Sequence, residues 1–185
     1  SSVEELLERL RRISEENKRR IEKLLREVEK VLRELKDRHR KLLKRVEEII
    51  RKVKEEIKSG LPEEAVKRVL ERVRERVKEV LEEADRLNDE MRRIVTEVEK
   101  ELDKSDKEVE DAVRDILKKI EEGVRDRETA ERARETLKRL LDENRDRSKK
   151  VKEEIRRILE DLTMSCAQES REIAKLLKEL EDTAR

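Results

Sequence analysis

The chain contains no Phe, Tyr or Trp among its 185 residues. Without aromatic rings it offers nothing on which nucleic-acid bases could stack. No apolar run approaches the length of a membrane span, so we expect no transmembrane helix. The N-terminus opens directly into a charged helical pattern, and we therefore expect no signal peptide.

The chain has one cysteine and almost no net charge. A single cysteine cannot form an internal disulfide bond, which suits a reducing cytosol. The 52 basic and 51 acidic residues leave a net charge of +1. The two signs are interspersed, so no face carries the one-sided field that nucleic acid or an anionic membrane requires. We therefore predict neither a nucleic acid nor a membrane as a partner.

Two glycines and one proline divide the chain into three segments of similar length. Gly60 followed by Pro62 is typical of one helix ending and the next beginning. Gly123 indicates a second helix end, and Asp126 is the expected N-cap of the helix that follows. Three long helices joined by two short loops are therefore expected.

Ser2, with Glu5 three residues later, forms a capping box for the first helix. The predicted helices cover residues 2–59, 62–122 and 126–184. Because short loops force neighbouring helices to be antiparallel, the expected fold is an all-α, up-down-up three-helix bundle of long, nearly straight helices. We predict one domain over residues 1–185 and a monomer, with domain swapping as an open alternative.

Apolar residues recur along each predicted helix at the helical period. In the first helix they take fifteen steps over 54 residues, about 3.6 residues per step. This period leaves helices nearly straight, and it argues against the disorder that a high charge content alone would suggest. The positions predicted to face inward in the first helix are Val3, Leu7, Leu10, Ser14, Asn17, Ile21, Leu24, Val28, Val31, Leu35, His39, Leu42, Val46, Ile49, Val53 and Ile57.

Polar residues interrupt these apolar seams at one level. When the chain is folded at its two loops, Asn17, Ser105 and Asn144 fall at almost the same height, with Ser14 and Ser148 within a turn of them. A buried polar layer from three helices fixes their register, because a slip leaves amides unpaired. We predict such a layer, and the alternative is that these residues face water.

His39 is the only histidine, and it lies on the seam at nearly the level of Cys166. We predict a buried histidine in a second polar layer, with Asn88 as its candidate partner. Zinc needs about four ligands, and only His39 and Cys166 are available here. Neither layer supplies a cleft with a group poised near neutrality. We therefore predict no metal, no cofactor and no enzymatic activity.

One stretch of the third helix departs from the pattern of charged outer positions. Residues 162–170 read LTMSCAQES, in which the six residues 163–168 after Leu162 are all uncharged and include the single cysteine. Helical spacing places Cys166 and Glu169 on the seam and turns Met164 and Gln168 outward. An inward glutamate and an exposed methionine conflict with stability, and local conflict of this kind marks a functional segment.

This stretch resembles the core of the C-terminal degron of ornithine decarboxylase over Met164, Ser165, Cys166, Ala167, Gln168, Glu169 and Ser170, and Leu162 also agrees. The resemblance implies delivery to the proteasome without ubiquitin, with Cys166 essential. Two departures stand out. Thr163 replaces the proline of the degron, and fifteen residues follow Ser170 although the degron acts near a free C-terminus. An interior proline would break the helix.

The rest of the chain resembles de novo designed helical bundles with buried hydrogen-bond networks, and the combination resembles the LOCKR class of designed switches. The resemblance implies that the first two helices form a cage and that the later part of the third is a latch hiding the degron. A designed key peptide or helix would compete for the cage and expose the degron to the proteasome. A synthetic protein has no native location. A natural spectrin-like triple helix, and a plain designed bundle or heterodimer subunit without switching, remain alternatives.

Overall fold

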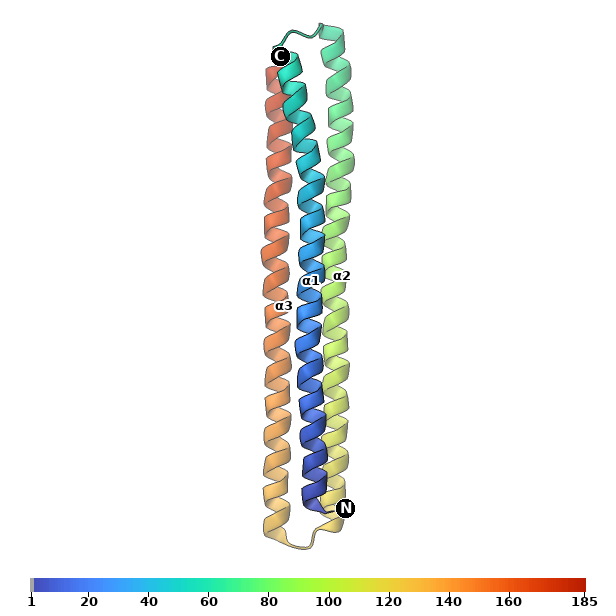
Figure 1. The fold of residues 1–185 in the computed structure, drawn as a ribbon, viewed down its shortest axis with the longest axis vertical. Helices are drawn as coiled ribbons and strands as arrows, with labels where there is room; N and C mark the ends of the chain where they lie inside the picture. The colour runs from blue at the N-terminus through green and yellow to red at the C-terminus, as the bar shows by residue number, and fades with distance from the viewer. Residues whose placement is uncertain (1) are drawn as a thin grey trace. The chain divides into compact units, whose positions relative to one another are not determined.

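A computed structural model describes residues 2–185 of the chain as three α-helices. They are α1 (Val3–Lys58), α2 (Glu63–Gly123) and α3 (Arg127–Thr183), and each is continuous from end to end (Figure 1). The all-α three-helix fold predicted from the sequence is confirmed, and every helix end lies within one residue of its expected position.

The chain forms two compact units, and each unit takes a part of all three helices. Unit 1 combines Ser1–Glu29 with Ile94–Arg157, and unit 2 combines Lys30–Arg93 with Ile158–Arg185. From the sequence we predict one domain over residues 1–185. In the structure, each unit has a hydrophobic cluster of its own. The two units are therefore described separately.

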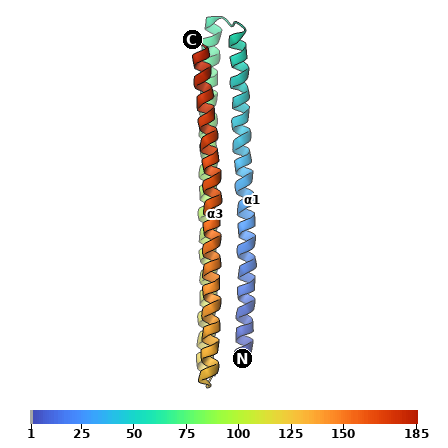
Figure 2. The same ribbon diagram turned by 90° about the vertical axis from the view of Figure 1, so that its left-hand side faces the viewer.

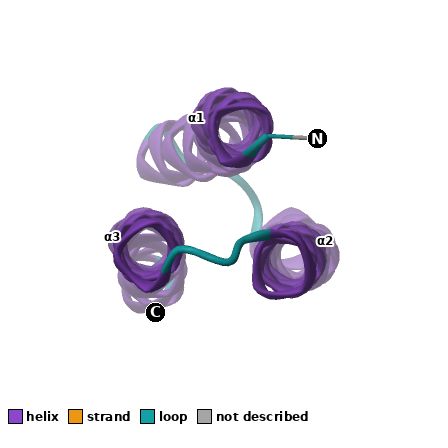
Figure 3. Ribbon diagram, turned by 90° about the horizontal axis from the view of Figure 1, so that it is seen from below, coloured by secondary structure: helices purple, strands orange, loops and turns teal. Residues whose placement is uncertain are grey.

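In unit 1 the three helices pack around an aliphatic cluster, and each helix is next to the other two (Figure 3). Ion pairs join Arg134 of α3 to Glu121 of α2 and Arg145 to Glu110. Since residue numbers rise along α3 as they fall along α2, these two helices are antiparallel. The buried members of the cluster are Leu6, Leu10, Val109, Val113, Ile116, Ile120, Ala133 and Leu137.

Unit 2 is built in the same way around a second aliphatic cluster. The colour gradient of Figure 2 shows that residue numbers rise in the same direction along α1 and α3. Arg74 of α2 pairs with Glu181 of α3 at an N···O distance of 2.8 Å. The buried members of the cluster are Leu43, Val46, Ile50, Val53, Leu70, Val73, Val77, Val80, Ala84, Ile173 and Leu180.

The buried face of α1 follows the predicted period but differs in phase at several steps. Val31 and Ile49, both predicted to face inward, are exposed, while Leu32 and Ile50 beside them are buried. The same exchange places Leu6 and Leu43, rather than Leu7 and Leu42, among the buried residues. An apolar stripe in such a bundle spans more than one residue per turn, so spacing alone does not decide which of two adjacent apolar residues is central.

The two glycines end their helices differently. Gly60 adopts the left-handed φ of 102°, and its N–H donates to the Ile57 carbonyl over 3.2 Å. Gly123 does not have a positive φ and is the last residue of α2. Only Gly60 therefore occupies a conformation that side chains disfavour.

The starts of α1 and α3 are capped as the sequence indicates. The hydroxyl of Ser2 accepts a hydrogen bond from the Glu5 N–H at 3.2 Å. The carboxylate of Asp126 accepts from the Glu128 N–H at 3.3 Å and from the Thr129 hydroxyl at 2.6 Å. Each cap gives a partner to groups that would otherwise lack one within the helix.

Replacing the two glycines by alanine is expected to have opposite effects. Gly60→Ala should lower the free energy of unfolding by about 1–2 kcal/mol, because a Cβ disfavours the left-handed conformation. Gly123→Ala should leave it unchanged or raise it by up to about 1 kcal/mol, because alanine favours the helix and nothing lies within 4 Å of the added Cβ. Chemical denaturation of both variants measures the two changes. Equal losses would show that the loop conformations are assigned wrongly.

Candidate functional site

The polar residues of unit 1 form a directional chain of hydrogen bonds that passes through all three helices. The Ser105 hydroxyl on α2 donates to the Asn17 Oδ1 atom on α1. The Asn17 amide donates in turn to the Asn144 Oδ1 atom on α3. The Asn144 amide then donates to a carboxylate oxygen of Asp106 on α2 at 3.3 Å. The structure thus brings together three of the residues assigned to one layer from the sequence and adds Asp106 to them.

Asp106 ends this chain as an acceptor. Burial raises the pKa of the Asp106 carboxyl above its ordinary value, although Lys152 and the Asn144 amide oppose that rise. The Ser148 hydroxyl also acts to lower this pKa, but the hydroxyl falls short of hydrogen-bond geometry and has no partner among residues 2–185. Ser148 and Ser14 are both buried, as expected of members of the layer.

The predicted pairing of His39 with Asn88 is not what the structure contains. His39 is fully buried, and its Nδ1 atom lies 2.9 Å from a carboxylate oxygen of Glu169. Within residues 2–185, the His39 Nε2 atom and the Asn88 Oδ1 atom have no hydrogen-bond partner. The charge of a nearby carboxylate makes it a stronger acceptor than a neutral amide oxygen, so His39 pairs with Glu169 instead.

The degron-like segment 162–170 is helical throughout and lies within α3 in unit 2. Cys166 is completely buried, while Met164 is 70% exposed and Gln168 is also exposed. The orientation of these three side chains matches the helical spacing of the sequence. The segment therefore presents its cysteine to the interior and a mixed apolar and polar face to the outside.

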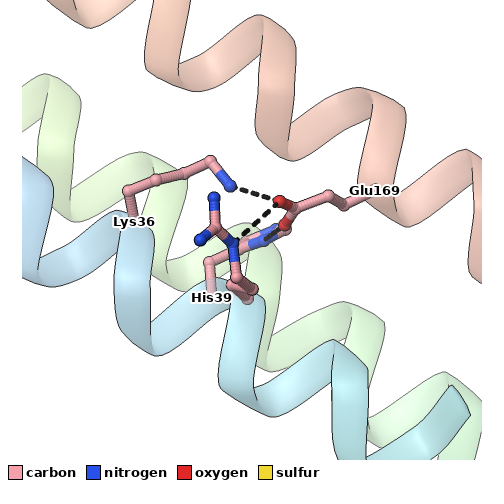
Figure 4. A network of polar contacts seen from close by, with 4 residues as sticks. Lys36, His39 and Glu169 are labelled. Atoms are coloured by element: carbon pink, nitrogen blue, oxygen red, sulfur yellow. Dashed lines mark hydrogen bonds and ion pairs between the residues drawn. The ribbon is translucent and has the colours of Figure 1, made fainter.

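Glu169 lies at the centre of a cluster of charged and polar side chains (Figure 4). Lys36 donates to the Glu169 Oε1 atom, and its side chain is only 8% exposed. Since a carboxylate only accepts, the His39 Nδ1 atom is the donor to the Oε2 atom. The Arg40 Nε atom lies 3.9 Å from Oε1. From its inward position in the sequence, Glu169 is expected to be unfavourable for stability. This expectation is wrong, because α1 supplies its carboxylate with partners.

These partners set the protonation of the cluster. Burial opposes ionisation of Glu169, but hydrogen bonds from Lys36 and His39 outweigh it and hold the pKa below the ordinary value of 4.5. Burial raises the pKa of the Cys166 thiol to about 11, with Lys36 opposing and Glu169 reinforcing the rise. Such a thiol is protonated and unreactive at neutral pH, since the thiolate is the nucleophile.

Lys36, Arg40 and Asp106 are the members of these two sites that sequence reasoning misses. Each has a residue type that is abundant on the outer faces of all three helices, so composition does not single it out. A usable signal does exist for Lys36. It lies one turn before His39, at the level of the inward Glu169, and a buried carboxylate requires a cation at that level.

Comparisons with known proteins support the fold and leave the sites unassigned. No known protein family matches the chain, and no curated protein matches it. Among solved structures, the chain is similar to one described as "Computationally designed three helix bundle", with a TM-score of 0.70 and 15% sequence identity. The similarity covers 98% of this chain and 90% of that one. At this identity the likeness shows a shared three-helix fold.

Residues 2–185 contain neither a membrane-spanning helix nor a cluster of metal ligands. No helix among them has a stretch apolar enough, over a sufficient length, to cross a membrane. Nowhere in this range do three or more His, Cys, Asp or Glu side chains gather in a way that could hold a metal ion.

Substitutions in the polar layer should be strongly non-additive. Asn17→Leu alone is expected to lower the free energy of unfolding by about 1–3 kcal/mol, because Ser105 and Asn144 each lose a buried partner. Asn17→Leu combined with Asn144→Leu should cost less than the sum of the two single changes, since both members of the central bond leave together and Ser105 is then the only buried donor that loses its partner. Chemical denaturation of the two single variants and the double variant measures the coupling.

Asn88→Leu provides the matched control for this series. Its side-chain oxygen already lacks a partner, so removing the amide should be neutral or stabilising. A neutral effect of Asn17→Leu as well would mean that the hydrogen-bonded chain contributes nothing to stability.

The contribution of Glu169 to stability should depend on pH. Since its folded-state pKa is lowered, this contribution is present above the ordinary value of 4.5 and disappears as the pH falls through the folded-state value. Glu169→Gln should therefore be less stable than the parent at pH 7, by about 1–3 kcal/mol, and the difference should be smaller at pH 3. Glu179→Gln, at an exposed position of α3, should follow the parent at both values. A difference that persists unchanged at pH 3 would contradict this assignment.

Proposed function

We propose that the chain is a designed helical switch in which α3 hides a proteasome degron against α1 and α2. The observation that carries this proposal is the complete burial of Cys166 within the degron-like segment. The cysteine is the essential residue of the degron that the segment resembles. A docked α3 therefore withholds the group that recognition requires.

The surroundings of the segment also support caging. The buried lysine and the single histidine of the chain both face Glu169, which belongs to the degron-like sequence. These partners lie on α1, which is far from the segment in sequence. Such a match is expected if α1 was chosen to accommodate a segment taken from elsewhere.

Release of the segment depends on an opening equilibrium. An opening free energy of about 3 kcal/mol leaves roughly 1% of molecules with Cys166 accessible. A key helix shifts this equilibrium only by binding the opened cage better than the closed one. The partners implied are a helical key and, after opening, the proteasome, in a reducing cytosol. We propose no catalytic activity, cofactor or nucleic-acid partner.

A plain designed bundle without switching is the second candidate function. The continuous helical packing of the segment favours it, because the fold needs no release step to explain the structure. The two candidates differ in whether Cys166 becomes accessible when a competing helix is added.

Thiol labelling distinguishes these candidates. Cys166 in the intact chain should react with a thiol reagent roughly 100-fold more slowly than an exposed cysteine, if opening costs about 3 kcal/mol. The matched control carries Cys166→Ala and Ala167→Cys, which moves the thiol to the exposed neighbouring position. A peptide copying residues 127–183 with Cys166→Ala should accelerate labelling of the intact chain. Labelling as fast as the control without any peptide would show that the segment is not caged.

A cellular experiment tests the degron itself. A reporter fused to the chain should have a shorter lifetime when the same peptide is co-expressed, and Cys166→Ala should abolish the shortening. Glu179→Gln, at an exposed position of α3 outside the degron-like segment, should leave it intact. If the Cys166→Ala variant is degraded as quickly as the parent, the resemblance to the degron is coincidental and the plain bundle is the better description.

A further inference from the structure

The carboxylate of Glu169 is recognised by a site that lies entirely on α1. Lys36 and His39 donate to its two oxygens, and the Arg40 Nε atom is 3.9 Å away (Figure 4). Lys36 and His39 are buried, while the side chain of Glu169 is 26% exposed. The donors therefore belong to the interior of unit 2, and the acceptor approaches them from α3.

In this arrangement the buried charge that needs a partner lies on α1. If α3 is displaced by a helix that has no carboxylate at this level, the Lys36 ammonium remains buried without a counter-charge. Leaving one member of a buried pair unpaired costs far more than the net contribution of the intact pair. A helix that binds here is thus selected by whether it carries an acidic side chain at one position.

A groove between α1 and α3 in unit 2 extends the same preference for acidic side chains on the helix that binds α1. Its floor is apolar and contains Leu43 and Ile173. The α1 side carries mainly basic residues, Arg40, Lys44 and Arg51 with Glu47 among them, whereas α3 contributes Glu169 and Glu172. The surface of α1 is therefore complementary in charge to an amphipathic helix with acidic residues beside its apolar stripe.

We propose that Lys36, His39 and Arg40 form a carboxylate-reading site on α1, and that its competing partner is a helix carrying Glu or Asp at the position of Glu169. This inference rests on the proposed displacement of α3 for its biological use. The site itself is testable in the chain alone. It makes Glu169 a specificity determinant of docking in addition to a member of the degron-like segment.

The first experiment measures Cys166 labelling in variants of the intact chain. Glu169→Gln should accelerate labelling by at least about tenfold, because Lys36 loses its counter-charge. Adding Lys36→Met to Glu169→Gln should return the rate towards that of the parent, since the unpaired cation is removed as well. Glu179→Gln removes the same charge from an exposed position of α3 and should have no effect. An unchanged rate in Glu169→Gln, or a failure of Lys36→Met to restore it, overturns the proposal.

The second experiment compares three peptides that copy residues 127–183 and carry Cys166→Ala, so that only the intact chain contains a thiol. One keeps Glu169, one carries Glu169→Gln and one carries Glu179→Gln. The first and third should accelerate labelling equally, and the second should require at least about tenfold higher concentration for the same rate. Equal potency of all three overturns the carboxylate-reading site and leaves the switch standing. If no peptide accelerates labelling, displacement of α3 is wrong, and the variants of the intact chain still decide whether the site exists.

Discussion

Within each unit, the fold depends on pairing a few buried polar groups of one helix with partners at the same level of another. The core is filled mainly by branched aliphatic side chains and alanine, with no Phe, Tyr or Trp to fix one packing arrangement. Aliphatic side chains tolerate a shift of a helix along its neighbour better than hydrogen bonds do. In unit 1 the chain from Ser105 to Asn17 to Asn144 specifies one register. In unit 2 the Glu169 cluster does so by charge.

The number, length and ends of the helices could be predicted because local chemistry determines them. Gly60, Pro62 and Asp126 act on the backbone next to them, and the helical period is visible within any one segment. The choice between Val31 and Leu32 could not be predicted in the same way. It depends on where the two other helices lie around α1, and the sequence of α1 alone does not give their positions.

The candidate sites divide along the same line. Asn17 and Asn144 could be predicted because an amide on an apolar seam is conspicuous. The partner of His39 was predicted incorrectly, since pairing with Glu169 depends on side-chain reach across α1 and α3. Lys36 has a side chain long enough to bury its methylene groups while its ammonium pairs with a carboxylate. Its residue type does not distinguish it from the many exposed lysines, and only its level beside the inward Glu169 does. Long-range electrostatic pairing is thus the part of the structure least visible in a one-dimensional pattern.

The sulfur atoms of Met164 and Cys166 lie two residues apart in the chain and in opposite environments. Met164 is 70% exposed, whereas Cys166 and the other methionine, Met91, are completely buried. A mild peroxide therefore oxidises Met164 whether or not α3 is docked, and the polar sulfoxide forms on a face that is already exposed to solvent. Cys166 is oxidised only while the segment is open, and Met91 only when the core around it opens. The pattern of oxygen atoms added to these three residues is consequently a chemical record of which parts of the molecule have been exposed, and for how long.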